Sequence, residues 1–277
     1  MLQVTVVVVS YNTRDLLRRC LESLADVDQV IVVDNASADG SADMVGSEFP
    51  MVELVANPDN RGFGAANNQG LARRRHEIAL LLNSDAAAEP GAIARLLDEM
   101  VPGVVAVGGG LVTGGSLSPS ACRSLTLGRL LCEQLFLEKL FRGSFMDTYW
   151  IRSDRTMEVE QVMGACLMFR PVEPFDERFF LYCEDTELCR RLRKHGRILY
   201  IPEARFEHAL GASSSGNRWW SVAMYNRGKE LYFRIHHGRA AMAAAWCINR
   251  LGALLRLPFK PMFWRVHTAP LSGPKVR

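Results

Sequence analysis

Two adjacent carboxylates, Glu184 and Asp185, follow a run of aromatic residues and begin a segment with the periodicity of an amphipathic helix. Leu188 and Leu192 recur at helical spacing behind them, and Glu187 shares their first turn. A positioned carboxylate can accept a proton from a hydroxyl group and so act as a general base. The alternative is that these acids only interact with the unpaired backbone N–H groups of a helix N-terminus. The choice between the two depends on the other segments of the chain.

Three other apolar segments end in small polar residues. They end at Ser10-Tyr11-Asn12, at Asp34-Asn35 and at Asn83-Ser84-Asp85. Short apolar runs that alternate with helical patterns are typical of buried parallel strands. The carboxyl ends of parallel strands meet at one edge of the sheet, where open α/β sheets bind ligands. The sequence therefore predicts a ligand crevice lined by these polar ends.

A glycine-rich loop precedes another helical pattern and contains Asn60, Arg61, Gly62 and Asn67. Glycine allows close backbone approach, and the N-terminus of a helix favours an anionic group, so this loop suits a diphosphate or a sugar. It does not have the Gly-x-Gly-x-x-Gly spacing of dinucleotide-binding loops, because Asn67 stands where the last glycine would be. Arg61 is expected to pair with phosphate, or else to lie in solvent.

Taken in order, these motifs, together with Gly164-Ala165, resemble those of the family 2 glycosyltransferases, particularly the bacterial rhamnosyltransferase-like branch. The resemblance covers roughly residues 3 to 235. It implies an α/β protein of the GT-A fold, with a Rossmann-like, mostly parallel sheet flanked by helices. It also implies an inverting enzyme of cell-surface polysaccharide synthesis. Such an enzyme moves rhamnose or a similar sugar from a dTDP- or UDP-linked donor to a saccharide or polyprenyl-linked acceptor.

The resemblance assigns roles to individual residues. Asp185 is the expected base for the acceptor hydroxyl, and Glu184 positions the acceptor or the helix. The expected donor-binding residues are Ser10, Tyr11, Asn12, Asp34, Asn35, Asn60, Arg61, Gly62, Asn67, Ser84 and Asp85. Asp34 would accept a hydrogen bond from a pyrimidine N3–H, although aspartate also forms turns. The expected acceptor-binding residues are Gly164, Ala165, Trp219 and Trp220.

A divalent cation, Mg²⁺ or Mn²⁺, is expected at Asp85, where it would neutralise the departing diphosphate. The family usually has Asp-x-Asp here, whereas this chain has Asn83-Ser84-Asp85. We therefore expect weak binding that depends largely on phosphate. His208 either completes the metal site or is a structural histidine.

The chain of 277 residues divides by composition into a predicted catalytic domain, 1–210, and a C-terminal region, 211–277. The catalytic domain has a nucleotide-sugar-binding half, 1–112, and an acceptor half, 113–210, whose first part resembles an insertion. The C-terminal region reads as a flexible Ser/Gly loop and a basic amphipathic helix. Arg250 lies near the middle of its apolar segment, so a membrane span would be costly. The helix is expected to lie on a membrane surface or to pack on the domain.

The formal charge of +3 gives no support for nucleic-acid binding. Seven cysteines without CxxC spacing favour free thiols in a reducing compartment. The first apolar run is too short for a signal peptide. We therefore expect a cytoplasmic protein that associates peripherally with the inner face of the cell membrane if the helix binds lipid.

Two other functions share parts of this pattern. A nucleotidyltransferase would be expected to carry a glycine-rich basic phosphate loop near the N-terminus, which Ser10-Tyr11-Asn12 does not provide. A catalytically weak binding subunit would tolerate loss of the acid pair, but Glu184 and Asp185 are both present. Neither alternative accounts for all of the motifs.

Overall fold

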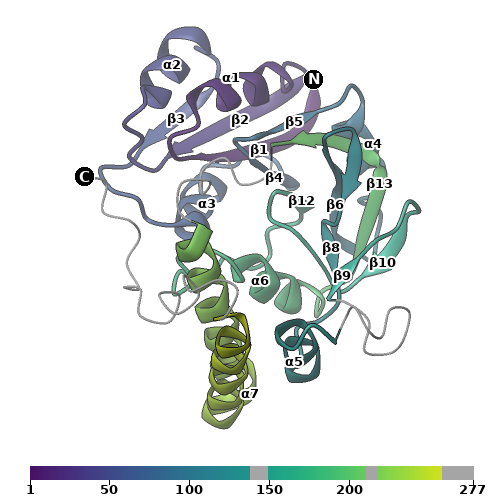
Figure 1. Ribbon diagram of the computed structural model, residues 1–277. Helices are drawn as coiled ribbons and strands as arrows, with labels where there is room; N and C mark the ends of the chain where they lie inside the picture. Colours follow the sequence, from purple (N-terminus) through teal and green to yellow (C-terminus); the bar gives the residue numbers. More distant parts are fainter. Residues whose placement is uncertain (138–148, 210–217, 258–277) are drawn as a thin grey trace.

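The computed structural model describes residues 1–137, 149–209 and 218–257 (Figure 1). Its centre is a ten-stranded mixed sheet with the strand order β10-β13-β6-β12-β4-β1-β2-β3, to which β5 and β7 add at β13 and β6. The strands are β1 (Leu2–Ser10), β2 (Val27–Asp34), β3 (Glu53–Ala56), β4 (Ala79–Asn83), β5 (Ala86–Ala88), β6 (Val104–Thr113), β7 (Ser116–Ser118), β10 (Met157–Val159), β12 (Cys166–Phe169) and β13 (Arg197–His208). A small second sheet has the order β11-β8-β9, from β8 (Ala121–Cys122), β9 (Trp150–Ile151) and β11 (Gln161–Val162).

The N-terminal half is the alternating parallel unit that the sequence predicts. β1 pairs in parallel with both β2 and β4, and β2 with β3. The register places Ser10 opposite Asp34 and Val9 opposite Asn83. The predicted meeting of these polar strand ends at one edge of the sheet is confirmed.

Strand β12 departs from the parallel pattern, since it lies antiparallel between β4 and β6. It brings the segment that follows Gly164-Ala165 into the middle of the sheet. β13, at the other side of β6, is again parallel to β6.

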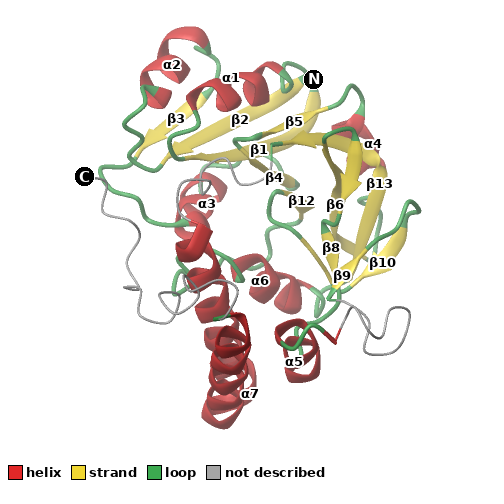
Figure 2. Cartoon of the chain, viewed as in Figure 1, coloured by secondary structure: helices red, strands yellow, loops and turns green. Residues whose placement is uncertain are grey.

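Helices cover the two faces of the sheet (Figure 2), and an apolar layer lies between the helices and each face. Helices α1 (Arg14–Glu22), α2 (Ser41–Glu48) and α4 (Ala92–Asp98) pack on one face, and α3 (Phe63–Leu71) and α6 (Glu184–Leu192) on the other. Val6 and Val8 of β1 point into the first layer and Val7 into the second. β1 is therefore apolar throughout because it is buried on both faces.

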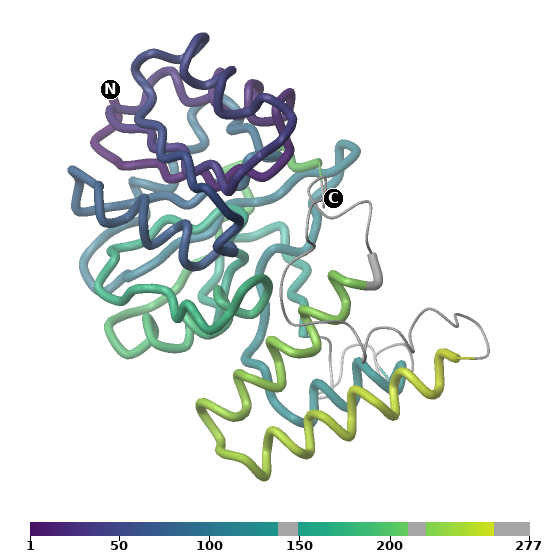
Figure 3. The backbone as a smooth tube through the Cα atoms, turned by 90° about the vertical axis from the view of Figure 1, so that its left-hand side faces the viewer, coloured from purple at the N-terminus to yellow at the C-terminus, as the bar shows by residue number. Residues whose placement is uncertain are grey.

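The C-terminal helix α7 (Arg218–Arg256) is bent at Gly238, whose φ of 84° and ψ of −179° are not helical. Figure 3 shows a first arm, residues 218–237, that leads away from the sheet, and a second arm, residues 239–256, that turns back beside α5 (Leu127–Gln134). Asn249 joins the arms, because its Nδ2 donates to Asn226 O at 3.3 Å and Glu230 Oε1 at 3.0 Å. The predicted C-terminal helix thus packs on the protein, although residues 210–217 and 258–277 of that region lie outside the described residues.

A buried ion pair fixes α5 to the first arm. The ammonium group of Lys229, a residue with 0% exposure, lies 2.6 and 2.8 Å from the carboxylate oxygens of Glu133. The Lys229 Nζ also lies 3.9 Å from the ring centroid of Tyr225, which adds a cation–π contact. The Glu133 side chain keeps 29% exposure, so the two partners differ in their access to water.

This asymmetry gives a stability prediction. Glu133→Ala leaves a fully buried ammonium group unpaired and should lower the free energy of unfolding by about 3–5 kcal/mol in urea denaturation. Lys229→Met should cost less, because water can reach the remaining carboxylate. The double variant should be more stable than Glu133→Ala alone. Glu207→Ala, which removes an exposed partner of Arg19, is the control and should change little. Equal losses in the two single variants would contradict this account of the pair.

Candidate functional site

The ends of β1, β2 and β4 form a connected polar edge. Thr13 Oγ1 donates to Ser84 Oγ at 2.8 Å and lies 3.3 Å from Ser10 Oγ, so one threonine joins two predicted site residues. All three side chains are buried. Thr13 was not among the predicted site residues, because only the fold brings it within reach of Ser84, 71 positions later.

Asp34 has one satisfied and one free carboxylate oxygen at this edge. Its Oδ1 accepts from Ser37 N at 2.8 Å, whereas Oδ2 is buried and has no hydrogen-bond partner in the described structure. Nearby, Asn12 adopts a positive φ of 53° and its Oδ1 accepts from Ala38 N at 2.7 Å. Tyr11, between Ser10 and Asn12, is partly exposed. An unpaired buried carboxylate oxygen is costly, so this position favours a hydrogen-bond donor supplied by a ligand.

The glycine-rich loop connects this edge to the acidic segment before α6. Asn35 Nδ2 donates to Gly62 O at 3.2 Å, and Gly62 N donates to Asn60 Oδ1 at 2.9 Å. Phe63 N donates to Phe180 O at 2.9 Å. Gly62 has a φ of 84°, and a Cβ there would collide with the Phe180 carbonyl, so only glycine fits.

The two other predicted residues of this segment differ in exposure. Arg61 is half-exposed, with its Nε 3.7 Å from Asp59 Oδ1. Asn67 is buried in α3, where its Nδ2 donates to Phe63 O at 3.0 Å. Its Oδ1 has no partner in the described part of the chain. Arg61 is thus free to reach a ligand at the surface, whereas Asn67 is fixed inside.

Asp85 and His208 meet at the end of β4, with Asp85 Oδ1 3.2 Å from His208 Nε2. Both are buried, and Asn83 Nδ2 lies 3.5 Å from the same imidazole nitrogen. His208 Nδ1 has no partner among the described residues. The structure therefore brings together the two residues that the sequence predicted as metal ligands, 123 positions apart along the chain, although the described residues contain no group of three or more such ligands.

The acidic turn, which we define as residues 180–185, is backbone-strained. Tyr182 and Cys183 both have a φ of 69°, a conformation that non-glycine residues rarely adopt. Gly228 of the first arm packs against it, and a Cβ there would lie 2.6 Å from Tyr182 O and 3.0 Å from Cys183 Cβ. This close approach of α7 supports the strained turn, which in turn sets the direction of the two carboxylates.

The two acids of the pair have different environments. Glu184 is 4% exposed, and its Oε2 has no hydrogen-bond partner within the described ranges. Burial, together with the neighbouring Asp185 charge, raises the pKa of Glu184 well above 4.5. Asp185 is partly exposed, and burial raises its pKa against the opposing effect of hydrogen bonds from Gly164 N at 3.0 Å and Thr186 N at 2.7 Å. Only Asp185 is thus open to an incoming ligand.

Gly164-Ala165 joins the acidic turn to the end of β4. Gly164 N donates to Asp185, while Ala165 O accepts from Asn83 N at 3.0 Å.

The predicted acceptor residues Trp219 and Trp220 lie in the first turn of α7. The Trp219 side chain lies outside the described residues. Trp220 is 7% exposed and packs edge-on against Phe180 at a centroid distance of 6.2 Å, so it supports the acidic turn from behind.

Comparison with known proteins adds relatives to this geometry. The profile of the family described as "Glycosyl transferase family 2" matches residues 5–131. The chain is 27% identical to the N-acetylglucosaminyl-diphospho-decaprenol L-rhamnosyltransferase of Mycobacterium tuberculosis, in an alignment of 272 positions that covers 84% of each protein. It is 35% identical over 100 positions to the succinoglycan biosynthesis protein ExoO of Rhizobium meliloti, a match that covers 34% of this chain and 29% of ExoO.

Solved structures show the same fold at low identity. The mannosyltransferase PcManGT from Pyrobaculum calidifontis, in complex with GDP-Man and Mn²⁺, has a TM-score of 0.55 and 17% identity, over 95% of this chain and 83% of that one. S. aureus TarS 1-349 in complex with UDP-GlcNAc has a TM-score of 0.54 and 14% identity, over 96% of this chain and 79% of that one.

Proposed function

Because the chain is a family 2 glycosyltransferase of the GT-A fold, we propose that it moves rhamnose or a similar sugar from a dTDP- or UDP-linked donor to a polyprenyl-linked saccharide. The mycobacterial relative, which aligns over most of both chains, is named as an L-rhamnosyltransferase of N-acetylglucosaminyl-diphospho-decaprenol. A product of this kind belongs to cell-surface polysaccharide synthesis.

The hydrogen-bonded connection between Asp185 and the donor edge carries the proposal. Gly164-Ala165 links the partly exposed Asp185 carboxylate to Asn83, two residues before Asp85. In the reaction, the acceptor oxygen forms a bond to the anomeric carbon and its proton passes to Asp185. The bond from that carbon to the diphosphate oxygen breaks, and the nucleoside diphosphate leaves with the electron pair.

The difference between the two acids favours a single displacement. A retaining glycosidase needs two carboxyl groups that flank the bond, one of them a nucleophile. Glu184 is buried, and its raised pKa favours the neutral acid, which is a poor nucleophile. One base, Asp185, on the side opposite the leaving group therefore supports inversion of the anomeric configuration. Glu184 is then assigned the role of a positioning residue at the start of α6.

The donor edge has suitable groups for a pyrimidine nucleotide. The unpartnered Asp34 Oδ2 can accept from a pyrimidine N3–H, and the hydroxyl groups of Ser10 and Ser84 lie at the ends of the neighbouring strands. The loop at Asn60 and Gly62 presents backbone near the start of α3, and Arg61 can reach a phosphate.

A divalent cation fits at Asp85 and His208. Asp85 Oδ1 and His208 Nε2 lie 3.2 Å from each other, and carboxylate oxygen and imidazole nitrogen are both ligand types that Mn²⁺ accepts. The other ring nitrogen, His208 Nδ1, has no hydrogen-bond partner among the described residues. Two protein ligands leave most of the coordination to diphosphate oxygens and water. When bound, the cation supplies positive charge to the leaving diphosphate.

The second arm of α7 is proposed as a membrane-contact face. Exposed apolar side chains repeat along it at helical spacing, namely Ala240, Ala243, Trp246, Cys247, Leu251, Leu254 and Leu255, and the exposed Arg239 lies at its start. Arg250 lies within this face but pairs with Glu230 at 2.8 Å and stacks on Trp246 at 3.9 Å. Within the described residues, no helix has an apolar stretch sufficient to cross a bilayer. An apolar helix face beside basic residues suits attachment to the surface of an anionic membrane.

Asp185→Asn should abolish most transfer, because removing a general base typically costs about 10²–10⁴-fold in rate. Glu184→Gln should retain most activity, because glutamine resembles the neutral acid that the raised pKa favours. The measurement is nucleoside diphosphate release with a polyprenyl-diphosphate saccharide acceptor, with donor affinity by calorimetry as the control for folding. Normal turnover by Asp185→Asn would show that another group is the base.

Donor binding should depend on a divalent cation through Asp85 and His208. Calorimetric titration of dTDP- and UDP-sugars should show tighter binding with Mn²⁺ than with a chelator. Asp85→Asn should remove most of this difference and His208→Ala part of it. Equal affinities with and without the cation in the unaltered protein would exclude this site.

Trp246→Ser combined with Leu254→Ser should reduce co-sedimentation with vesicles that contain phosphatidylglycerol. The loss has a simple cause, because two exposed apolar side chains would no longer be available for insertion. Leu117→Ser, at an exposed position on β7, is the matched control and should bind like the unaltered protein. If the double variant sediments as well as the control, the second arm does not bind lipid.

A further inference from the structure

A cavity of about 280 Å³ opens beside Asp185. Three parts of the chain form its walls: the acidic turn through Tyr182, the predicted insertion through Tyr149 and Trp150, and the first arm of α7 through Val222 and Tyr225. All of these residues lie outside the segment 5–131 that matches the family profile. The cavity is therefore built by segments outside the family profile.

The walls of the cavity are aromatic and largely apolar. Tyr182 and Tyr225 pack edge to face at a centroid distance of 6.1 Å, and Tyr149 and Trp150 at 5.5 Å. Asp185 supplies the only charged side chain among its lining residues within the described structure. Lys229 lies behind the Tyr225 ring, where it is fully buried and paired with Glu133. No cation in the described lining is therefore available for a diphosphate.

The size of the cavity limits its occupant. Pockets for drug-sized ligands measure roughly 300–1,000 Å³, so a space of about 280 Å³ suits one sugar ring and not a nucleotide. A pyranose has an apolar face of C–H groups that packs on aromatic side chains, and hydroxyl groups at its rim. Ser221 also lines the cavity, and its Oγ has no hydrogen-bond partner among the described residues, so it can serve such a hydroxyl.

We propose that this cavity binds the terminal, uncharged pyranose of the acceptor, with its apolar face against Trp150 and Tyr182 and its reactive hydroxyl at Asp185. This inference rests on the proposed function and adds the recognition of the acceptor. The diphosphate and lipid of the acceptor then lie outside the cavity.

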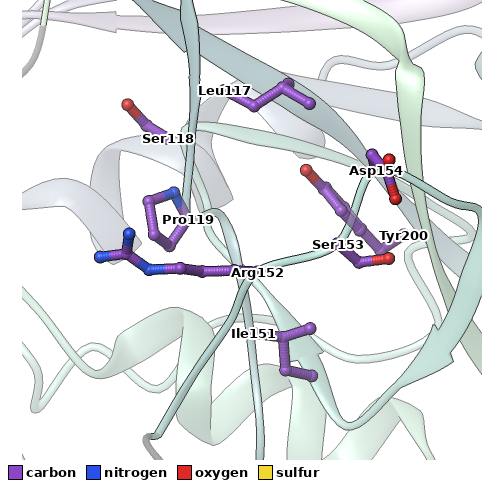
Figure 4. Close-up of a pocket in the computed structure, with 8 residues that line it drawn as sticks. All are labelled: Leu117, Ser118, Pro119, Ile151, Arg152, Ser153, Asp154 and Tyr200. Atoms are coloured by element: carbon purple, nitrogen blue, oxygen red, sulfur yellow. The ribbon is translucent and has the colours of Figure 1, made fainter.

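A second cavity, of about 310 Å³, provides the contrast (Figure 4). It is lined by Leu117, Ser118, Pro119, Ile151, Arg152, Ser153, Asp154 and Tyr200. Successive residues of a strand point to opposite faces, so β9 directs Trp150 to the first cavity and Ile151 to the second. The second cavity carries Arg152 and Asp154 and does not include Asp185, so it lacks a base for the acceptor hydroxyl.

Val222→Trp tests the proposal by filling the cavity from a partly exposed helix position. We expect the KM for the acceptor to rise by about 10- to 200-fold, the range for a misfit in a pocket. Donor affinity by calorimetry should remain unchanged. Val172→Trp makes the same substitution at an exposed valine away from both cavities and should leave the acceptor KM unchanged.

A second variant covers the case in which Val222→Trp does not fold. Trp150→Ala empties the cavity instead of filling it and should also raise the acceptor KM while donor affinity is kept. An unchanged acceptor KM in a folded variant would overturn the acceptor cavity and leave the glycosyltransferase function intact. Failure of the unaltered protein to bind any nucleotide sugar would instead overturn the proposed function itself.

Discussion

The placement of a buried carboxylate, Glu184, directly beside a partly exposed one, Asp185, at the start of α6 is the constraint on which the site depends. Desolvation raises the pKa of both Glu184 and Asp185, because removing a carboxylate from water disfavours its charged form. The rest of the fold must therefore hold both side chains in place against this cost. The surrounding chain supplies this support from two directions. The loop at Gly62 and Phe63 contacts Phe180 on one side, and Gly228 of α7 packs on the left-handed turn from the other. Packing on both sides offsets the backbone strain, and the strain in turn directs one acid outward and the other inward.

The C-terminal helix is therefore packed into the structure around the acidic turn. Its first arm contacts the acidic turn through Gly228, and the adjacent Lys229 is fixed to Glu133 of α5 by a buried ion pair. Breaking a buried pair leaves an uncompensated charge, which costs far more than the pair contributes. Separation of α5 from α7 would leave the buried ammonium group of Lys229 unpaired, so the ion pair holds the two helices together. The same arrangement leaves the second arm with its apolar face exposed, because its packed face is already used against α5 and the first arm.

Much of the fold follows from local pattern in the sequence. The apolar runs predicted the parallel strands, and the polar residues at their ends predicted the crevice, because strand ends in a parallel sheet must meet. Leu188 and Leu192 are fully buried, as their helical spacing predicted. Other features depend on contacts that no local pattern encodes. The antiparallel insertion of β12, the link from Thr13 to Ser84 and the aromatic cavity each join residues far apart in the chain. The bend at Gly238 was also missed, because a glycine within an apolar helical pattern is compatible with a straight helix.

In the proposed reaction, the separation of polar and apolar surfaces around Asp185 lets one carboxylate serve between an anionic donor and a neutral hydroxyl. Negative charge on the donor would repel a carboxylate and raise its pKa further if both shared one space. Gly164-Ala165 instead joins the polar strand ends, through Asn83, to Asp185, which lines the aromatic cavity, so the proposed donor and acceptor sites are separate. A base of raised pKa in an apolar cavity is stronger than an exposed aspartate, and it remains usable because two backbone N–H groups stabilise its charge.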